Sequence, residues 1–340
     1  MKPSIALDAM GGDHGPAAVI PAALHMLKKY SDLQLILVGH QDILRQTLRD
    51  NHANEEKRLI VHHASQRVQM NDLPAQALRN KKDSSMRVAI NLVHDGIAHA
   101  CVSAGNTGAL MATARFVLKT LPGIDRPAFC TMMPAINGHT HLLDLGANVD
   151  STSEQLFQFA VMGAVLTSAV DNSPDPQVAL LNVGEEDMKG NERVKETAAL
   201  LTESDLNYVG FVEGTDIFKG VVDVIVCDGF VGNVAIKASE GVAEMIAHYA
   251  KEEFEKSIYG RLVALFSRPV IKSLRRKTDP RRYNGASLLG LRGIVIKSHG
   301  RADKVSFAHA IQEAIIEVQK NVPDRISSLL ESLLIERQAV

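Results

Sequence analysis

One short run of this chain, residues 103–108, combines residue types suited to holding an anion. It reads Ser-Ala-Gly-Asn-Thr-Gly and precedes a helix-period pattern over 110–120. Its two glycines would let the backbone approach a ligand, and a helix beginning there offers unpaired N–H groups and a positive dipole end. A tight turn with a polar cap is the alternative, at about equal weight. We predict an anion site formed by Ser103, Gly105, Asn106, Thr107 and Gly108.

Arg87 lies in the first turn of a second predicted helix, over 84–97. A cation at that end of a helix opposes the helix dipole, so a purely stabilising role is disfavoured. A guanidinium beside a bound anion makes better sense, because it grips phosphate through two parallel hydrogen bonds. We therefore add Arg87 to the anion site; plain exposure to solvent is the alternative.

The cluster 9–16, Ala-Met-Gly-Gly-Asp-His-Gly-Pro, follows the first apolar run. Its glycine spacing departs from the dinucleotide-binding fingerprint, and the acidic residue expected about 20 positions later is missing. A metal site built from Asp8, Asp13 and His14 is conceivable, but Asp13 capping a helix opened by Pro16 is the favoured interpretation. No metal or cofactor is predicted, and the cluster contributes cleft residues Asp8, Gly11, Gly12 and Asp13.

Two later clusters carry candidate catalytic side chains. Lys189 is a lone cation among four carboxylates in 184–192, either a catalytic group or a locally paired surface lysine. Asn233 follows the most β-branched run and is expected to open a helix, with Lys237 one turn on. Its amide is either an N-cap or a donor to a developing oxyanion.

The three cysteines, Cys101, Cys130 and Cys227, have no metal-type spacing and are expected to be buried, reduced thiols of a cytoplasmic protein. The formal net charge of −2 indicates no particular partner, and 4% aromatic residues without tryptophan disfavour nucleic-acid stacking. The N-terminus leads directly into an apolar run, so no signal peptide is expected. No apolar run approaches the length of a membrane span.

These clusters need a scaffold, and the chain repeats the same unit six times. Apolar runs end in Gly, Asp or Asn before a helical pattern, at 5–8, 35–38, 100–102, 142–145, 178–183 and 221–227. This repetition predicts an α/β fold with a mostly parallel sheet and helices on both faces. Ligands bind beyond the carboxyl ends of such strands, so all the clusters are expected on one edge. Further helices are predicted at 153–170, 306–320 and 324–335.

The stretch 256–282 breaks the pattern, with nine basic residues against one acid and interleaved apolar residues. Pro269 should divide it into two short helices. A core helix with a basic face is one interpretation. The favoured one is a protruding basic amphipathic arm, over 249–282, that binds anionic lipid or an acidic protein. Its contact residues would be Arg261, Leu262, Leu265, Phe266, Arg268, Lys272, Arg275 and Arg276.

Taken together and in order, these motifs resemble the bacterial phosphate acyltransferase (PlsX) family of phospholipid synthesis. The resemblance covers residues 4–323 and rests on ALDAMGGDHGP (6–16), SSMRVAI (84–90), VSAGNTGALMA (102–112), LLDLGANVD (142–150), QFAVMG (158–163), LLNVGEEDMKGNE (180–192), VCDGFVGN (226–233) and YNGASLLGLRGIVIKSHG (283–300). At Ser151, many family members have a cysteine, which disfavours covalent catalysis at that position.

The resemblance implies transfer of a long-chain acyl group from acyl carrier protein to inorganic phosphate, without a cofactor. It implies one three-layer αβα domain over 1–340, similar to phosphotransacetylase and isopropylmalate dehydrogenase, and a homodimer in the cytoplasm bound peripherally to the membrane. The product would pass to a glycerol-3-phosphate acyltransferase. Lys189 and Asn233 would be the central pair, and the family motifs add to the cleft Asn148, Asp228, Lys297 and His299.

The chemistry agrees with this transfer. Phosphate is itself a nucleophile near neutral pH, so the protein needs an anion seat, an oxyanion donor and a proton source for the leaving thiolate. Two other functions stay open: a nucleotide-dependent α/β enzyme and a non-catalytic scaffold at the membrane surface.

Overall fold

The computed structural model describes residues 2–339, without the side chains of 274–278, 280, 282 and 333–339. Its described part contains one eleven-stranded sheet in the order β3-β2-β1-β4-β11-β10-β5-β6-β9-β7-β8. The strands are β1 (Ser4–Asp8), β2 (Gln34–Gly39), β3 (Leu59–His63), β4 (Ala100–Ser103), β5 (Ala128–Ala135), β6 (Gly138–Leu143), β7 (Val178–Leu181), β8 (Tyr208–Val212), β9 (Val224–Val226), β10 (Ala286–Leu289) and β11 (Ile294–Lys297).

The sheet consists of two parallel halves that run in opposite directions. In the first half β1, β2, β3, β4 and β11 are parallel, and in the second half β6, β7, β8 and β9 are parallel. Between them β10 is antiparallel to β11 and β5, and β5 is antiparallel to β6. The carboxyl ends of the two halves nevertheless meet at the centre of the sheet, because Leu143 at the end of β6 pairs with Cys130, Cys130 with Ser287, and Ser287 with Ile296 near the end of β11. The polar clusters therefore face one another there and do not line one edge of a single parallel sheet, since the central antiparallel strands reverse the direction of the second half.

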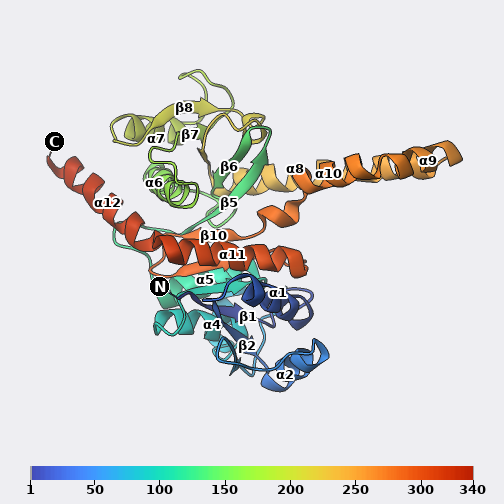
Figure 1. The fold of residues 1–340 in the computed structure, drawn as a ribbon. Coiled ribbons are helices and arrows are strands. Elements are labelled where there is room, and N and C mark those ends of the chain that lie inside the picture. The colour runs from blue at the N-terminus through green and yellow to red at the C-terminus, as the bar shows by residue number, and fades with distance from the viewer. Residues whose placement is uncertain (1, 340) are drawn as a thin grey trace.

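Helices cover both faces of the sheet (Figure 1). In the first half α1, α2 and α11 share a core on one face, and α3, α4 and α5 pack on the other. In the second half α6 and α12 share the core of one face, with α7 against α6. The helices are α1 (Pro16–Lys29), α2 (Gln41–Asp50), α3 (Pro74–Asn80), α4 (Ser85–His94), α5 (Thr107–Leu118), α6 (Ser153–Val170), α7 (Glu192–Thr202), α8 (Gly229–Glu255), α9 (Ile258–Phe266), α10 (Arg268–Thr278), α11 (Lys304–Lys320) and α12 (Val322–Ala339), with 3-10 turns η1 (Asp216–Phe218) and η2 (Pro280–Tyr283).

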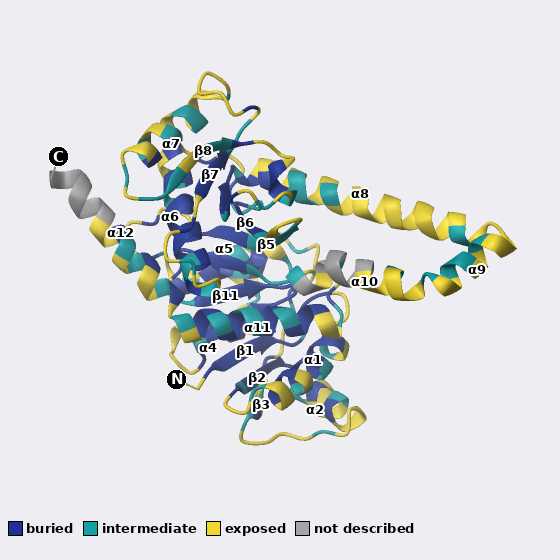
Figure 2. Cartoon of the chain, turned by 45° about the horizontal axis from the view of Figure 1, so that its top comes forward, coloured by how far each residue is buried: buried dark blue, intermediate teal, exposed yellow. Residues whose placement is uncertain are grey.

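Helix α6 matches its predicted range of 153–170 because its start is well defined. Thr152 Oγ1 accepts a hydrogen bond from Gln155 N, and the Thr152 N–H donates to the Gln155 side-chain oxygen. This capping box satisfies two of the helix's free N–H groups. The helix is buried on nearly all sides (Figure 2), which explains its uniformly apolar sequence.

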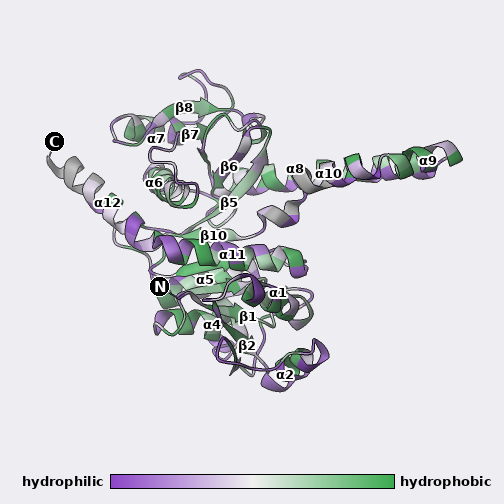
Figure 3. Cartoon of the chain, viewed as in Figure 1, coloured by the Kyte–Doolittle hydropathy of each residue, from purple (hydrophilic) through white to green (hydrophobic). Residues whose placement is uncertain are grey.

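A long projection leaves the body of the protein through α8, α9 and α10 (Figure 1). Most of α8 beyond its first turns and nearly all of α9 are exposed (Figure 2), and the far end of α9 is apolar (Figure 3). Pro269 lies in the first turn of α10, directly after the break at Ser267, so the predicted division at this proline is confirmed. The side chains of Arg275 and Arg276 lie outside the described residues. Among the described helices, none is both long and apolar enough to cross a membrane.

Candidate active site

Asp8, at the end of β1, is the anchor of the first half's carboxyl edge. Its buried carboxylate accepts a hydrogen bond from Ser85 Oγ at 2.6 Å and another from Ser103 Oγ at 2.6 Å. Ser103 Oγ in turn accepts one from Gly105 N at 3.0 Å. Burial raises the pKa of Asp8, although both serine hydrogen bonds oppose that change. Asp8 thereby joins β1, the start of α4 and the loop after β4.

Glycines let the loops after β1, β4 and β11 approach one another closely. A Cβ on Gly11 would lie 2.5 Å from Asp8 Oδ2 and 2.9 Å from Gly105 N. A Cβ on Gly12, whose φ is +77°, would lie 2.9 Å from the carbonyl oxygen of Gly300. Any side chain at either position would force these loops apart. The predicted cleft residues Gly11 and Gly12 therefore shape this edge of the sheet.

Asp13 and His14 do not join this cluster as a metal site. Both residues are exposed, whereas Asp8 is buried and occupied by its two serines. Asp13 N donates to the carbonyl oxygen of Gly300 at 2.8 Å. The expected cap by Asp13 is wrong: Gly15 is the N-cap of α1, and no side chain caps that helix.

The predicted anion loop does end at a helix, since α5 begins at Thr107 with Asn106 as N-cap. Asn106 Oδ1 accepts from Ala109 N at 2.9 Å, and its amide donates to the carbonyl oxygens of Met70 at 2.8 Å and Asp72 at 3.1 Å. Asn106 therefore caps the helix and holds the 70–72 segment. The backbone N–H groups of Thr107 and Gly108 are those that a helix leaves without an intrahelical partner, and they point toward an anion at this end.

Lys297 completes the first half's edge. It pairs in register with Ser103 of the neighbouring β4, and its ammonium group donates to the carbonyl oxygen of Ser298. Burial lowers the pKa of Lys297 to about 8, while the Asp8 charge opposes this change. A buried lysine that titrates near neutral pH suits either anion binding or proton transfer.

Arg87 lies apart from the anion loop. Its guanidinium stands over the Phe116 ring, 5.2 Å from the centroid, and its Nε donates to Asn91 Oδ1 at 3.1 Å. Phe116 lies nine residues after Thr107 in α5, which is about 13 Å along the helix axis. The structure therefore does not bring the Arg87 side chain to the N-terminus of α5.

Arg67 is the arginine that does lie beside Asp8, and the sequence analysis missed it. Its Nη2 donates to the carbonyl oxygen of Gly12 at 2.7 Å, and its charge lowers the pKa of Asp8. Its Nε is buried without a hydrogen-bond partner among the described residues, which is unusual unless a ligand supplies one. The sequence signal for Arg67 was the apolar run 59–61, which precedes this polar segment as a strand precedes a site loop. The two histidines that follow the run made it hard to recognise as a strand.

Asp144 has the equivalent anchoring role in the second half. Just after β6, it accepts hydrogen bonds from Phe129 N at 2.9 Å, from Asn148 N at 2.6 Å and from Asn148 Nδ2 at 3.0 Å. The Asn148 amide also donates to the Pro127 carbonyl oxygen at 2.9 Å. Asn148, a predicted cleft residue, is thus buried and fixes the shape of loop 144–148.

Asn233 lies on the surface of this loop. Its Nδ2 donates to the Leu145 carbonyl oxygen at 3.2 Å, and a Cβ on Gly146, whose φ is +106°, would lie 2.8 Å from Nδ2. The expectation that Asn233 opens the helix is wrong, because Asp228 is the N-cap of α8 and accepts from Phe230 N at 2.9 Å. Asn233 therefore lies in the second turn, and its second amide N–H is available to a substrate oxygen.

Helix α8 connects the carboxyl ends of the two halves. One turn beyond Asn233, Lys237 lies close enough to Lys297 and His299 to lower the pKa of both, after the larger effect of burial. His299 itself is held in the loop after β11, where its N–H donates to Asn284 Oδ1 at 2.8 Å. The first turns of α8 therefore carry Asn233 on the second half toward Lys297 and His299 on the first.

Lys189 occupies an open loop after β7. It is exposed and forms an ion pair with Glu186 at 2.7 Å, which raises the pKa of Lys189; Glu213 adds a smaller effect. Strand β9, which leads into α8 and Asn233, is the direct neighbour of β7, so the segments that carry Lys189 and Asn233 leave the sheet roughly 5 Å apart. Both lie on the second half's carboxyl edge, but no contact between their side chains is present.

The described residues offer no reactive cysteine. Burial raises the pKa of all three thiols, Cys101, Cys130 and Cys227, which confirms that they are buried and keeps them protonated. Ser151 is fully buried; its N–H donates to Asp228 Oδ2 at 2.8 Å and its carbonyl oxygen accepts from Arg193 at 2.9 Å.

The sequence matches known proteins over its whole length. Residues 3–325 match the family model described as fatty acid synthesis protein. The chain is 58% identical to the phosphate acyltransferase of Nitrosococcus oceani over 100% of both chains. It is 60% identical to the phosphate acyltransferase of Methylococcus capsulatus over 98% of both, and 54% identical to that of Legionella pneumophila strain Paris over 97% of both.

Solved structures share the fold at low sequence identity. A phosphotransacetylase from Streptococcus pyogenes superimposes with a TM-score of 0.64 at 16% identity, over 94% of both chains. A branched-chain phosphotransacylase from Enterococcus faecalis gives 0.58 at 16%, over 93% of this chain and 99% of that one. These confirm the predicted α/β architecture, and the full-length identities confirm the resemblance found in the motifs: the chain belongs to the phosphate acyltransferase family.

Proposed function

We propose that the protein transfers a long-chain acyl group from the thioester of acyl carrier protein to inorganic phosphate. A phosphate oxygen forms a bond to the thioester carbonyl carbon, the carbon–sulfur bond breaks, and the carrier thiolate takes up a proton. The products are an acyl phosphate and free carrier protein. Because phosphate is the nucleophile, the protein's own residues need to supply only positioning, electrostatic stabilisation and a proton.

The observation that carries this proposal for a member of this family is the buried Lys297, which lies in register with Ser103 at the start of the loop that leads into α5. Phosphate would bind to the first-turn N–H groups of α5, with Lys297 and Arg67 balancing its charge. Asn233, presented by α8, would donate to the thioester oxyanion. Lys189 would align the carrier thioester or protonate the leaving thiolate.

Phosphate dependence tests the reaction. Purified protein is incubated with palmitoyl carrier protein, with and without phosphate, and the acyl phosphate is detected by mass spectrometry. Thiol release should require phosphate and match acyl phosphate in amount. Equal release without phosphate would identify a thioesterase, and thermal protection by nucleotides without turnover would favour a nucleotide-dependent enzyme.

We also propose that the arm binds an anionic membrane surface peripherally. Around its tip, α9 exposes apolar side chains that include Leu262, Leu265 and Phe266, the last being 81% exposed. Described cations flank them at Lys256, Arg261, Arg268 and Lys272. Each cation near an anionic leaflet contributes about 1 kcal/mol, in addition to apolar burial. The acyl phosphate would then be released near a membrane-bound glycerol-3-phosphate acyltransferase.

The charge-neutral double change Leu265→Glu with Phe266→Lys tests this proposal. It should abolish co-sedimentation with phosphatidylglycerol vesicles and leave solution turnover nearly intact. Ile43→Glu with Ile60→Lys, at exposed positions of α2 and β3, is the matched control. Vesicle binding that survives the first pair would exclude apolar insertion, and lost turnover with intact vesicle binding would assign the arm to carrier protein.

A homodimer is proposed from the exposed apolar row Val242, Met245, Ile246 and Tyr249 on α8. These residues follow helical spacing and are each about half exposed or more, so a second copy has a continuous face to cover. Light scattering should give twice the chain mass, and Met245→Glu with Ile246→Lys should give monomers. A monomeric wild-type protein would contradict the proposal.

A further inference from the structure

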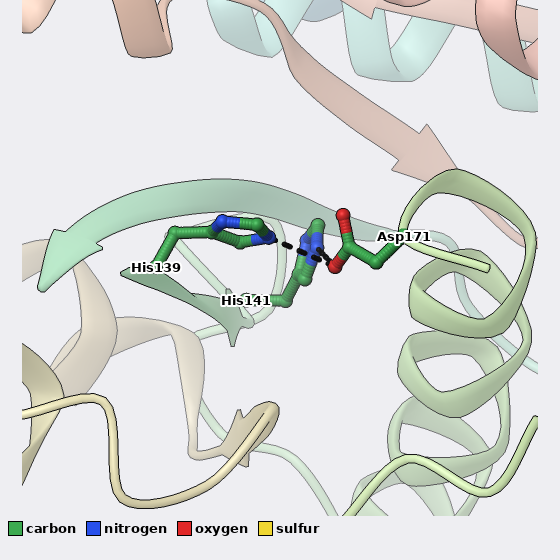
Figure 4. Close-up of side chains that lie close together, drawn as sticks. All are labelled: His139, His141 and Asp171. Carbon is green, nitrogen blue, oxygen red and sulfur yellow. Dashed lines mark hydrogen bonds and ion pairs between the residues drawn. The ribbon is translucent and has the colours of Figure 1, made fainter. Parts of the chain in front are cut away.

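A second cluster of chemically capable side chains lies on β6 and the end of α6 (Figure 4). Asp171 Oδ2 lies 2.8 Å from His139 Nε2 and 3.0 Å from His141 Nε2. The candidate ligand atoms of all three residues lie within 4.8 Å of one another. None of these residues belongs to the acyltransfer site described above.

The fold holds the three side chains together. His139 and His141 are two positions apart on β6, so both imidazoles leave the same face of the sheet. Asp171 is the C-cap of α6, which packs on that face. His141 is 2% exposed, and His139 and Asp171 are 31% and 24% exposed. The cluster is therefore preformed, largely buried and still reachable from outside.

The electrostatic surroundings favour a cation. Asp171 places a carboxylate at the negative end of the α6 dipole, where a positive charge is stabilising. Two further carboxylates interact with His139 or Asp171, namely Glu313 of α11 and Asp223 before β9. These carboxylates attract positive charge, which a divalent ion bound at the cluster would supply.

His141 Nε2 faces Asp171 Oδ2 at 3.0 Å, so an ion would take the place of that hydrogen bond. Its other nitrogen, Nδ1, is buried without a hydrogen-bond partner among the described residues. When Nε2 binds an ion, the ring proton lies on Nδ1. His141 and Glu313 also line a cavity of about 360 Å³ beside β5 and α11. That cavity gives an ion an entry path and room for a water or other ligand.

We propose that His139, His141 and Asp171 bind one divalent transition-metal ion of the zinc type, with an open coordination position toward this cavity. Two imidazole nitrogens and one carboxylate oxygen are the donor set of open zinc sites and of two-histidine, one-carboxylate iron sites. Tetrahedral bonds of roughly 2.0–2.1 Å would place the donor atoms roughly 3.3 Å apart. The 2.8 and 3.0 Å distances to Asp171 need a small expansion to reach that value, and the two imidazole nitrogens, which lie within 4.8 Å of each other, would have to adopt the same spacing. The ion would join the β5–β6 hairpin to α6, independently of acyl transfer.

Metal binding can be measured directly on the full-length protein after removal of adventitious metal with a chelator. Zn²⁺ affinity is measured by competition with a chromophoric chelator, and Co²⁺ is added as a spectroscopic probe. The wild type should bind one Zn²⁺ per chain, melt at a higher temperature with Zn²⁺ than without, and give visible Co²⁺ absorption. Asp171→Asn and His139→Gln should each weaken Zn²⁺ binding at least tenfold and lose the Co²⁺ signal.

His94→Gln is the matched control, because His94 also lies 2.9 Å from a carboxylate, that of Asp95, but on an exposed helix end with no second histidine. It should bind Zn²⁺ like the wild type. His139→Gln removes a one-third exposed side chain and so tests the site even if Asp171→Asn fails to fold. Absence of Zn²⁺ binding in the wild type, or equal binding in all four proteins, would overturn the proposal and leave the trio as a hydrogen-bonded clamp.

Discussion

The two halves of the sheet use charged residues in opposite ways. On the first half's edge, Asp8 and Lys297 are buried and surrounded by serines and close-packed glycine loops. On the second half's edge, Lys189 and Asn233 are exposed on a loop and on the surface of a helix. A buried, preorganised edge suits a small anion, whereas an open edge admits the thioester of a large carrier protein.

Two lysines show the difference most clearly. Burial lowers the pKa of Lys297 to about 8, while the ion pair with Glu186 raises the pKa of the exposed Lys189. Lys297 can change charge near neutral pH, and Lys189 stays cationic there. This difference predicts that changes on the first half's edge alter phosphate binding, whereas changes on the second half's edge alter turnover of the carrier thioester.

The largest effect is expected for Lys297→Met. Loss of the buried cation should lower kcat/KM for phosphate by about 10³-fold, the upper range for removal of one electrostatic contact in an active site. The fold should survive, because methionine fills a similar volume without the cost of a buried charge. Steady-state kinetics and a melting curve measure both. Near-wild-type phosphate kinetics would show that Lys297 does not belong to the phosphate-binding site.

Asn233→Ala should lower kcat by about 10²-fold, since an oxyanion donor acts mainly in the transition state. Asn233→Asp is the informative partner, because it keeps the size but replaces the amide donor with a negative charge. It should be at least as inactive as the alanine variant. Full activity of Asn233→Asp would show that the side chain only shapes loop 144–148.

Lys189→Ala should lower turnover by tens of fold with little change in the KM for phosphate. Lys219 is the matched control: it is also exposed and pairs with a carboxylate three residues away, Asp216, at 2.7 Å. Lys219→Ala should turn over like the wild type. Equal losses in both variants would indicate a general charge effect on carrier docking, and no loss in Lys189→Ala would exclude it from the chemistry.

The pH dependence of the KM for phosphate should distinguish the two edges, with a change of several-fold. Lys297 is cationic below its pKa of about 8 and neutral above it, so the KM for phosphate should rise as pH passes through 8. Lys297→Arg keeps its charge at higher pH, so its KM should rise much less. Lys189→Ala should keep the wild-type profile. The same rise in Lys297→Arg would assign the titration to another group.

Much of the fold and part of the candidate site could be predicted from the sequence. Helix α6 and the break at Pro269 follow from local signals, a capping box and a residue without an N–H. The direction of the second half could not be predicted, because short strands such as β10 and β11 decide it through long-range pairing. The His139–Asp171 contact was missed for the same reason: its partners lie 32 positions apart.

The smallest effect separates Arg87 from Arg67. The sequence alone assigned phosphate to Arg87, yet its guanidinium lies over Phe116, whereas Arg67 lies beside Asp8 and has an unpartnered buried Nε. Arg87→Lys keeps the charge and should change the phosphate KM by less than about twofold, because that side chain is about 13 Å along α5 from the helix start. Arg67→Lys loses the planar donor pair and should raise the KM about tenfold. Both are read from initial rates at fixed acyl carrier protein. If the two effects were reversed, the phosphate would have to lie toward the C-terminal end of α5, and the assignment of the first half's edge as the anion seat would fail.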